Sequence, residues 1–177
     1  MMKIKIINVL SFIITSVAFS MLSIVSYAGV QDYKQQIEQQ SYDEQHYCLA
    51  LNIYHEARSD SRLGQRAVGY VTLNRVHDSR YPDTVCDVVY QAHLDSNGNP
   101  RRNQCQFSWY CDGKSDTPQN QRKWEQIQQI AHQILNNYGK REDFTEGAVM
   151  YHASYVNPYW ASSYTRTVRI DTHIFYK

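Results

Sequence analysis

The chain has 177 residues, 42% of them hydrophobic and 20% charged, with 18 basic against 17 acidic side chains. This near-neutral balance excludes the strongly basic surface of a nucleic-acid-binding protein, so no nucleic-acid partner is expected. The length suffices for one domain with one core and not comfortably for two.

The N-terminus has the pattern of a secretory signal peptide. Lys3 and Lys5 precede an apolar run over residues 6–25, and small residues around Ala28 suit a signal peptidase. We predict that residues 1–28 are removed and that the protein is exported, either to the periplasm or to the extracellular space. A retained membrane anchor is the alternative, because the apolar run is nearly long enough to cross a bilayer.

Four cysteines follow the predicted signal peptide: Cys48, Cys86, Cys105 and Cys111. An even number in an exported chain predicts two disulfides, and three pairings are possible. A zinc site is disfavoured because no two of them have C-x-x-C spacing.

The first predicted elements are a tether and a helix. Residues 29–40 are predicted to form a polar, Gln-rich tether or a frayed helix, and residues 41–177 the folded domain. Residues 41–44 have the form of a capping box, which predicts a helix start. Apolar residues recur every three or four positions over 49–57 and predict a helix that ends before residues 59–61.

The middle of the chain predicts short elements. Helical spacing recurs over residues 67–76, and Thr84 is placed to cap a short helix over 85–89. Residues 95–100 have the composition of a loop, and the alternation over 106–110 predicts a short strand.

The last third predicts one helix and a sheet. Pro118 precedes the longest predicted helix, whose apolar stripe runs over residues 124–138. Segments rich in β-branched and aromatic residues follow at 148–153, 167–170 and 173–176. The fold class predicted is a mostly helical α+β domain with a small antiparallel sheet near the C-terminus.

Several motifs between Cys48 and Tyr176 together resemble the SleB-type cell wall hydrolases. They are Glu56-Ala57-Arg58, residues 64–68, residues 73–76, the turn at 81–85, Gln106-Phe107-Ser108 and His173-Ile174-Phe175. The resemblance implies a lysozyme-like core that cuts peptidoglycan between N-acetylmuramic acid and N-acetylglucosamine, with Glu56 as the general acid. It further implies lytic transglycosylation, which leaves 1,6-anhydro ends. His55 departs from many relatives, which carry a small or aromatic residue there.

Glu56 suits this chemistry on physical grounds. A general acid must keep its proton near neutral pH, whereas a free glutamate is mostly ionised. A place in the last turn of a helix and partial burial would both raise the pKa of Glu56. The competing interpretation is a surface glutamate paired with Arg58 or Arg66.

Glycosidases commonly use a second carboxylate. The candidates are Asp60, Asp87, Asp112, Glu146 and Asp171, and the sequence singles out none of them. A transglycosylase can work without one, because its nucleophile is a hydroxyl of the substrate.

Sugar binding requires flat apolar faces beside hydrogen-bonding groups, and the chain has 15 Tyr and 3 Trp. We predict that Ser108, Trp109, Tyr151 and Trp160 contact the substrate, although aromatic residues also serve in cores. Trp124 lies on a helical stripe and is assigned to the core.

Two alternatives belong to other functional classes. The zinc-protease signature fails because Ser59 stands where H-E-x-x-H needs histidine. A zinc-dependent N-acetylmuramoyl-L-alanine amidase with scattered ligands among the seven histidines remains open, as does a non-catalytic wall-binding module. We expect a monomer that binds peptidoglycan without a cofactor or metal, and the sequence identifies no regulatory protein.

Overall fold

The computed structural model describes residues 3–177, with side chains from residue 30 onward. The chain divides into two compact units, Met1–Tyr42 and Asp43–Lys177. The predicted signal peptide lies outside the residues with described side chains, so its cleavage and the limits of the predicted domains stay predictions. In the part of the chain that is described, none of the helices combines the length and the apolar character needed to span a bilayer.

The first helix, α1 (Lys3–Ala57), is 55 residues long and passes through Ser41 without a break. The capping-box prediction was therefore wrong. Residues 30–40 contain neither glycine nor proline and are rich in glutamine, which is a good helix former, so nothing there ends a helix. The end of α1 agrees with the prediction, and its apolar stripe, which includes Leu49 and Ile53, is buried.

Three further helices begin at residues whose side chains cap them. Ser61 caps α2 (Arg62–Val76), Thr84 caps α3 (Val85–Val89), and Asn120 caps α4 (Gln121–Asn137) by accepting from main-chain N–H groups. α2 contacts both α3 and α4. The sequence predicted that the helix after Pro118 would be the longest, but α4 is shorter than α1.

The main core lies between these helices and the end of α1. Its members are apolar side chains with the helical spacing expected from the sequence, among them Leu49, Ile53, Val68, Val88, Ile127 and Ile134. Trp124 packs against this cluster, as predicted. Burial of these side chains is the main source of stability for the second unit.

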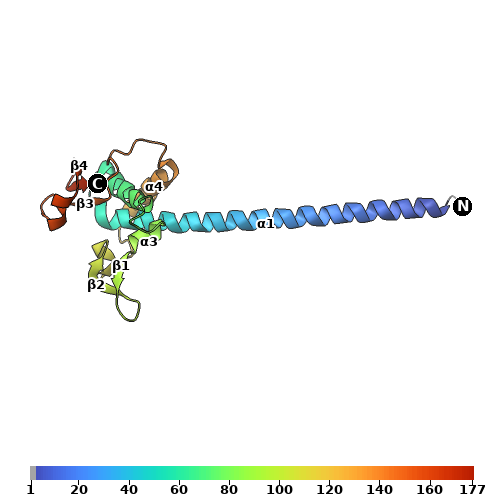
Figure 1. The fold of residues 1–177 in the computed structure, drawn as a ribbon, viewed down its shortest axis with the longest axis horizontal. Coiled ribbons are helices and arrows are strands. Elements are labelled where there is room, and N and C mark those ends of the chain that lie inside the picture. The colour runs from blue at the N-terminus through green and yellow to red at the C-terminus, as the bar shows by residue number, and fades with distance from the viewer. Residues whose placement is uncertain (1–2) are drawn as a thin grey trace. The chain divides into compact units, whose positions relative to one another are not determined.

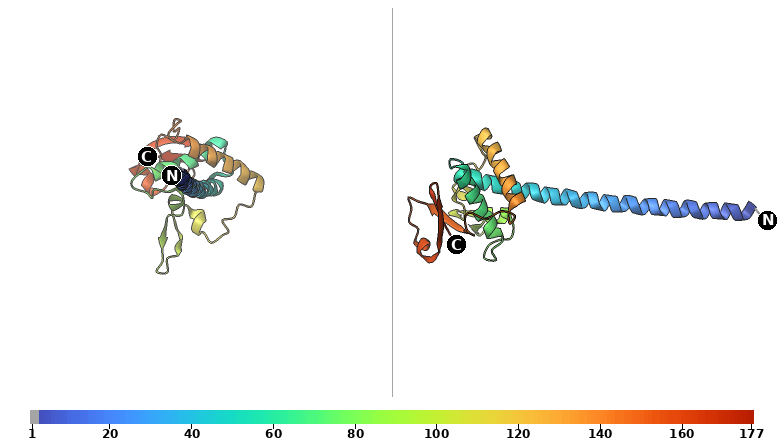
Figure 2. Two further views of the ribbon diagram at one scale, coloured as in Figure 1. Left: turned by 90° about the vertical axis from the view of Figure 1, so that its right-hand side faces the viewer. Right: turned by 90° about the horizontal axis from the view of Figure 1, so that it is seen from above.

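A hairpin follows α3 and extends away from the helices (Figure 1 and the left view of Figure 2). Strand β1 (Ala92–Leu94) pairs antiparallel with β2 (Pro100–Cys105), and Asp95 accepts from two main-chain N–H groups in the turn between them. The loop at 95–100 was expected, but the strands beside it were not.

The strand predicted over residues 106–110 is absent, and a 3-10 helix, η1 (Ser108–Cys111), stands there. The cause is the disulfide between Cys105 and Cys111, whose Cα atoms lie 6.1 Å apart. Six extended residues would span about 20 Å, so the chain must turn back on itself to close this bridge.

The last segments form a three-stranded antiparallel sheet in the order β3-β5-β4, as predicted (Figure 1, red). Its strands are β3 (Met150–Ala153), β4 (Arg166–Ile170) and β5 (His173–Tyr176), with the 3-10 helix η2 (Tyr159–Ser163) between β3 and β4. Phe175 and Ile170 pack with Ala67 and Val71 of α2 in a second apolar cluster. The predicted fold class is thereby confirmed.

Two disulfides are present, as expected, and the pairing that the sequence left open is Cys48–Cys86 and Cys105–Cys111. The first joins α1 to α3 across 38 residues of sequence. It fixes the helical turns that precede Glu56 against the main core.

Candidate active site

Glu56 lies in the last turn of α1, one residue before the helix ends, and its side chain is partly buried. The hydroxyl of Tyr151, on strand β3, donates a hydrogen bond to Glu56 Oε2 at 2.9 Å. The two residues are 95 positions apart in the sequence. The C-terminal sheet therefore supplies the direct partner of the carboxyl group.

Burial raises the pKa of Glu56 above its ordinary value of 4.5. The hydrogen bond from Tyr151 lowers this pKa, as do the charges of His173, Arg75 and His55, but burial is the largest effect. The carboxyl group consequently keeps its proton to a higher pH than a glutamate in water, as a general acid must.

Tyr151 is held in place by aromatic packing. Its ring lies 5.6 Å from that of Phe175 and meets the ring of His173 edge-on at 5.2 Å. Burial raises the pKa of Tyr151 well above 10, so the phenol remains protonated and serves as a donor. Its bond to Oε2 leaves Glu56 Oε1 to carry the transferable proton.

Arg75 of α2 is a buried cation near this pair. Its Nε donates to the carbonyl of Val149 at 2.7 Å, and its guanidinium lies 5.1 Å from the ring centre of Phe107. The side-chain oxygen of Gln106, when its amide is turned toward Arg75, accepts from both terminal nitrogens at 3.1 and 3.2 Å. Burial lowers the pKa of Arg75, but a guanidinium stays charged in any ordinary buffer.

His173 and Asp60 form a second buried pair. His173 Nδ1 lies 3.0 Å from Asp60 Oδ2, and their side chains are only 11% and 12% exposed. Among the described residues neither atom makes a hydrogen bond, so the close contact between them is what compensates their burial. This contact joins strand β5 to the loop after α1, and through the ring of His173 it supports Tyr151.

No carboxylate is among the charges that shift the pKa of Glu56. Three of the candidates for a second acid have other partners: Asp60 pairs with His173, Asp171 accepts from the main chain and hydroxyl of Ser61, and Asp87 accepts from Thr84. Asp60 still acts on Tyr151 through its charge, so it lies near the site, but among the described residues the carboxyl group that Tyr151 bonds to is that of Glu56.

Of the residues predicted to bind substrate, the structure brings Tyr151 to Glu56. Ser108 lies exposed at the start of η1. Trp160 lies in η2, where its ring contacts those of His152 and Tyr176. Substrate contact by Ser108 and Trp160 remains a prediction.

Trp109 is largely buried, with 7% of its surface exposed. Its indole stacks on the ring of His55, with centres 4.6 Å apart and planes at 16°, and its Nε1 donates to Asn52 Oδ1 at 3.1 Å. Such a ring can offer only an edge to a sugar. Trp109 therefore serves chiefly to fix His55, and its contact with substrate remains a prediction.

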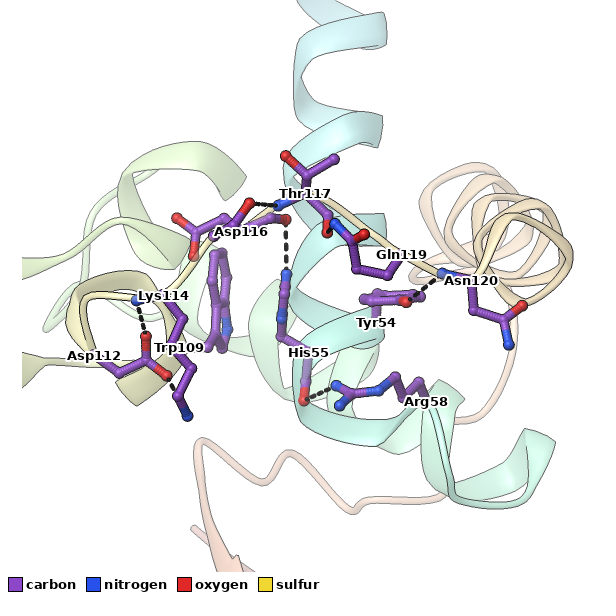
Figure 3. A pocket seen from close by; sticks show the side chains of 11 residues that line it. Tyr54, His55, Arg58, Trp109, Asp112, Lys114, Asp116, Thr117, Gln119 and Asn120 are labelled. Atoms are coloured by element: carbon purple, nitrogen blue, oxygen red, sulfur yellow. Dashed lines mark hydrogen bonds and ion pairs between the residues drawn. The ribbon is translucent and has the colours of Figure 1, made fainter.

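A cleft of about 520 Å³ lies on another face of the last turns of α1 (Figure 3). Tyr54, His55 and Arg58 line one side, and the loop over residues 112–120 lines the other, with Trp109 at one end. Sequence reasoning missed this loop, because its polar residues carry no motif that would distinguish it from an ordinary connection. Arg58 donates a long hydrogen bond of 3.4 Å to the carbonyl of His55 at the end of the helix.

Asn74 of α2 bonds to the main chain just before strand β3. Its amide is buried and donates to the carbonyl of Ala148 and to Asp143 Oδ2, both at 2.9 Å. Tyr138 donates to its carbonyl oxygen at 2.7 Å. Asn74 therefore anchors the segment that leads into strand β3.

Within the described residues, no group of three His, Cys, Asp or Glu side chains is arranged to hold a metal ion. His152 bonds to Tyr176, His55 bonds to the carbonyl of Asp116, and His173 pairs with Asp60. These contacts give the zinc-amidase alternative no support from the histidines of this region.

Comparison with known proteins identifies the family of this chain. The family model described as Cell Wall Hydrolase matches residues 59–176, starting just after Glu56-Ala57-Arg58. No curated protein matches the chain.

Two solved structures are similar over most of the second unit. The catalytic domain of the germination-specific lytic transglycosylase SleB from Bacillus anthracis is 26% identical, with a TM-score of 0.56, and the match covers 75% of this chain and 93% of that one. The catalytic domain of the Bacillus cereus SleB protein is 26% identical with a TM-score of 0.52, over 76% of this chain and 91% of that one. With the family match over residues 59–176, they confirm the resemblance drawn from the motifs: this chain belongs to the cell wall hydrolase family and is an enzyme.

Proposed function

We propose that this enzyme cleaves the glycan strand of peptidoglycan between N-acetylmuramic acid and N-acetylglucosamine, with Glu56 as the acid and then the base. The observation that carries this proposal is the partly buried Glu56 carboxyl group, oriented by Tyr151 and with its pKa raised by burial. Membership of the cell wall hydrolase family and the similarity to a lytic transglycosylase catalytic domain support the substrate.

The proposed reaction has two proton transfers. Glu56 Oε1 gives its proton to the glycosidic oxygen as the bond from that oxygen to C1 of N-acetylmuramic acid breaks, which frees the N-acetylglucosamine side as an alcohol. The Glu56 carboxylate then takes the proton of the muramic C6 hydroxyl as O6 bonds to C1. The product is a 1,6-anhydro end, no water is consumed, and Glu56 regains its proton.

A single acid is sufficient for this sequence. A retaining hydrolase needs a nucleophilic carboxylate about 5 Å from the acid, and an inverting hydrolase needs a base that activates water. Here the substrate provides the nucleophile, so the isolation of Glu56 from the other carboxylates fits transglycosylation. The hydrogen bond from Tyr151 grows stronger once Glu56 is ionised and so favours the proton transfer.

The proposed substrate lies outside the cytoplasm, so the enzyme must be exported to reach it. The predicted signal peptide and the two disulfides agree with this location, since disulfides persist in oxidising compartments. Peptidoglycan is accordingly the proposed partner.

The test is Glu56→Gln with Glu142→Gln as the matched control, because Glu142 is an exposed glutamate away from the site. On purified peptidoglycan, Glu56→Gln should lose about 10²–10⁴-fold in rate, the usual contribution of a general acid, while the control keeps full activity. Full activity of Glu56→Gln would refute the assignment.

The nature of the products tests the rest of the proposal. Mass spectrometry should find glycan ends that are lighter by one water than hydrolysed ends. Reducing ends would indicate hydrolysis instead. Release of free peptides, abolished by EDTA and restored by zinc, would favour the amidase.

A further inference from the structure

We propose that the cleft near Glu56 binds a carboxylate of the peptide stem carried by N-acetylmuramic acid. The guanidinium of Arg58 is the main protein group that binds this carboxylate. This inference rests on the proposed function and specifies the form of the substrate: a glycan that still bears its peptides. The cleft lies between the last turns of α1 and the loop over residues 112–120, with a volume of about 520 Å³ (Figure 3).

The walls of the cleft are fixed before any ligand arrives. His55 bonds to the carbonyl of Asp116 at 2.9 Å and stacks on Trp109. The main-chain N–H of Asn120 donates to the hydroxyl of Tyr54 at 3.0 Å, which anchors the other end of the loop. A preformed cleft of this kind spends little free energy on ordering when it binds.

Arg58 is an exposed cation that lines this cleft. Its guanidinium lies 5.4 Å from the ring centre of Tyr54 and makes one long hydrogen bond, 3.4 Å, to the carbonyl of His55. Among the described residues it pairs with no carboxylate. A guanidinium backed by an aromatic ring, with most of its five N–H donors unused, has the form of a bidentate carboxylate site.

The other charges of the cleft are mixed. Lys114 Nζ lies 3.4 Å from Asp112 Oδ2, and the same Asp112 accepts from the main-chain N–H of Lys114 at 2.8 Å, so these two largely neutralise each other. Asp116 lies on the same loop and offers an acceptor for an amine or an amide N–H. A cleft that holds both signs of charge suits a short peptide better than a neutral sugar.

The position of the cleft agrees with the shape of the substrate. His55 directly precedes Glu56, and Arg58 follows the end of α1 two residues after Glu56, so the cleft lies around the helix end from the carboxyl group. In peptidoglycan the peptide leaves the glycan through the lactyl group of N-acetylmuramic acid. A muramic residue bound at Glu56 can therefore direct its stem around the helix end and into the cleft.

The experiment measures binding and not turnover. Glu56→Gln serves as a background that does not consume the ligand, and calorimetry gives the dissociation constants of two probes. One is the N-acetylglucosamine–N-acetylmuramic acid disaccharide with a tetrapeptide stem, and the other is the same disaccharide without peptide. Arg58→Gln is added to this background, with the exposed Arg141→Gln as the matched control and Arg58→Lys as a variant that keeps the charge.

We expect the peptide-bearing probe to bind more tightly, and Arg58→Gln to weaken it about tenfold, the usual effect of a charge-assisted bidentate contact, while leaving the other probe within twofold. Arg58→Lys should recover part of the loss, and Arg141→Gln should change neither constant. Weakening of the peptide-free probe alone would identify its lactyl carboxylate as the ligand, against the peptide, because that carboxyl group is an amide in the other probe. Equal weakening of both probes would show a general effect on glycan binding and would also overturn the inference. No weakening of either probe would overturn the inference, and the activity of Glu56→Gln tests the proposed function separately.

Discussion

Removal of the Tyr151 hydroxyl group tests how its hydrogen bond affects proton transfer by Glu56. In Tyr151→Phe the ring that packs against His173 and Phe175 is kept, and only the donor of the 2.9 Å hydrogen bond to Glu56 Oε2 is lost. The fold should be preserved, because phenylalanine fills nearly the same volume. Any change in rate then reports on the hydrogen bond.

The size of the effect follows from the charge that Glu56 gains during proton transfer. A hydrogen bond to a neutral carboxyl group contributes about 0.5–1.5 kcal/mol, and one to a charged group about 1.5–3 kcal/mol. The difference of about 1–1.5 kcal/mol acts on the transition state alone, so kcat should fall roughly tenfold while KM stays nearly constant.

The pH dependence of kcat provides an independent test of the role of Tyr151. In the proposed mechanism activity requires protonated Glu56, so we expect activity to be lost as the pH rises through the pKa of Glu56. Tyr151 lowers that pKa by donating to the carboxylate. Its removal should therefore move the basic limb of the kcat profile to higher pH. The assay measures kcat on soluble glycan substrates over a range of pH. Tyr155→Phe is the control, because Tyr155 is 84% exposed. An unchanged kcat, or a basic limb at lower pH, would refute the assigned role of Tyr151.

Three further changes should alter stability in stated directions. Because burial raises the folded-state pKa of Glu56 above 4.5, the parent loses stability as the pH rises from 4.5 through that higher pKa. Glu56→Gln should therefore raise Tm at pH 7 by roughly 2–4 °C, for a gain of about 1 kcal/mol, and an equal gain at pH 4 would contradict this origin. Asp60→Ala should lower the free energy of unfolding in urea by about 1–3 kcal/mol, because it leaves the buried ring nitrogen of His173 without its polar partner, and a loss below about 0.5 kcal/mol would show the pair to be unimportant. Replacing Cys48 and Cys86 together by alanine should cost about 4 kcal/mol by the loop-entropy relation for a separation of 38 residues, and an unchanged urea midpoint would show that the bridge does not restrict the unfolded chain.

Local sequence signals predicted those elements that local interactions determine. Thr84 marked the start of α3 through its own side-chain bond, and the β-branched and aromatic segments near the C-terminus marked the sheet. The capping box at Ser41 failed because nothing in the glutamine-rich residues 30–40 ends the helix that precedes it. The strand predicted over 106–110 failed because a disulfide between Cys105 and Cys111 overrides the alternation.

The sequence predicted Glu56 as the candidate acid but did not predict the contacts around it. Glu56 followed from its motif and from its place at a helix end, and Tyr151 was expected near the substrate. Nothing local indicates that Tyr151 bonds to Glu56, or that Arg75 is buried behind them, because these contacts depend on how the sheet packs against α2. The loop over residues 112–120 was missed for the same reason.

The bond between Glu56 and Tyr151 is also completed late in synthesis. A chain still being made carries Glu56 long before strand β5 exists, and Tyr151 gains its neighbours His173 and Phe175 only with that strand. A molecule clipped before β5 would keep both residues of the hydrogen bond but would lose the two rings that hold Tyr151 against Glu56.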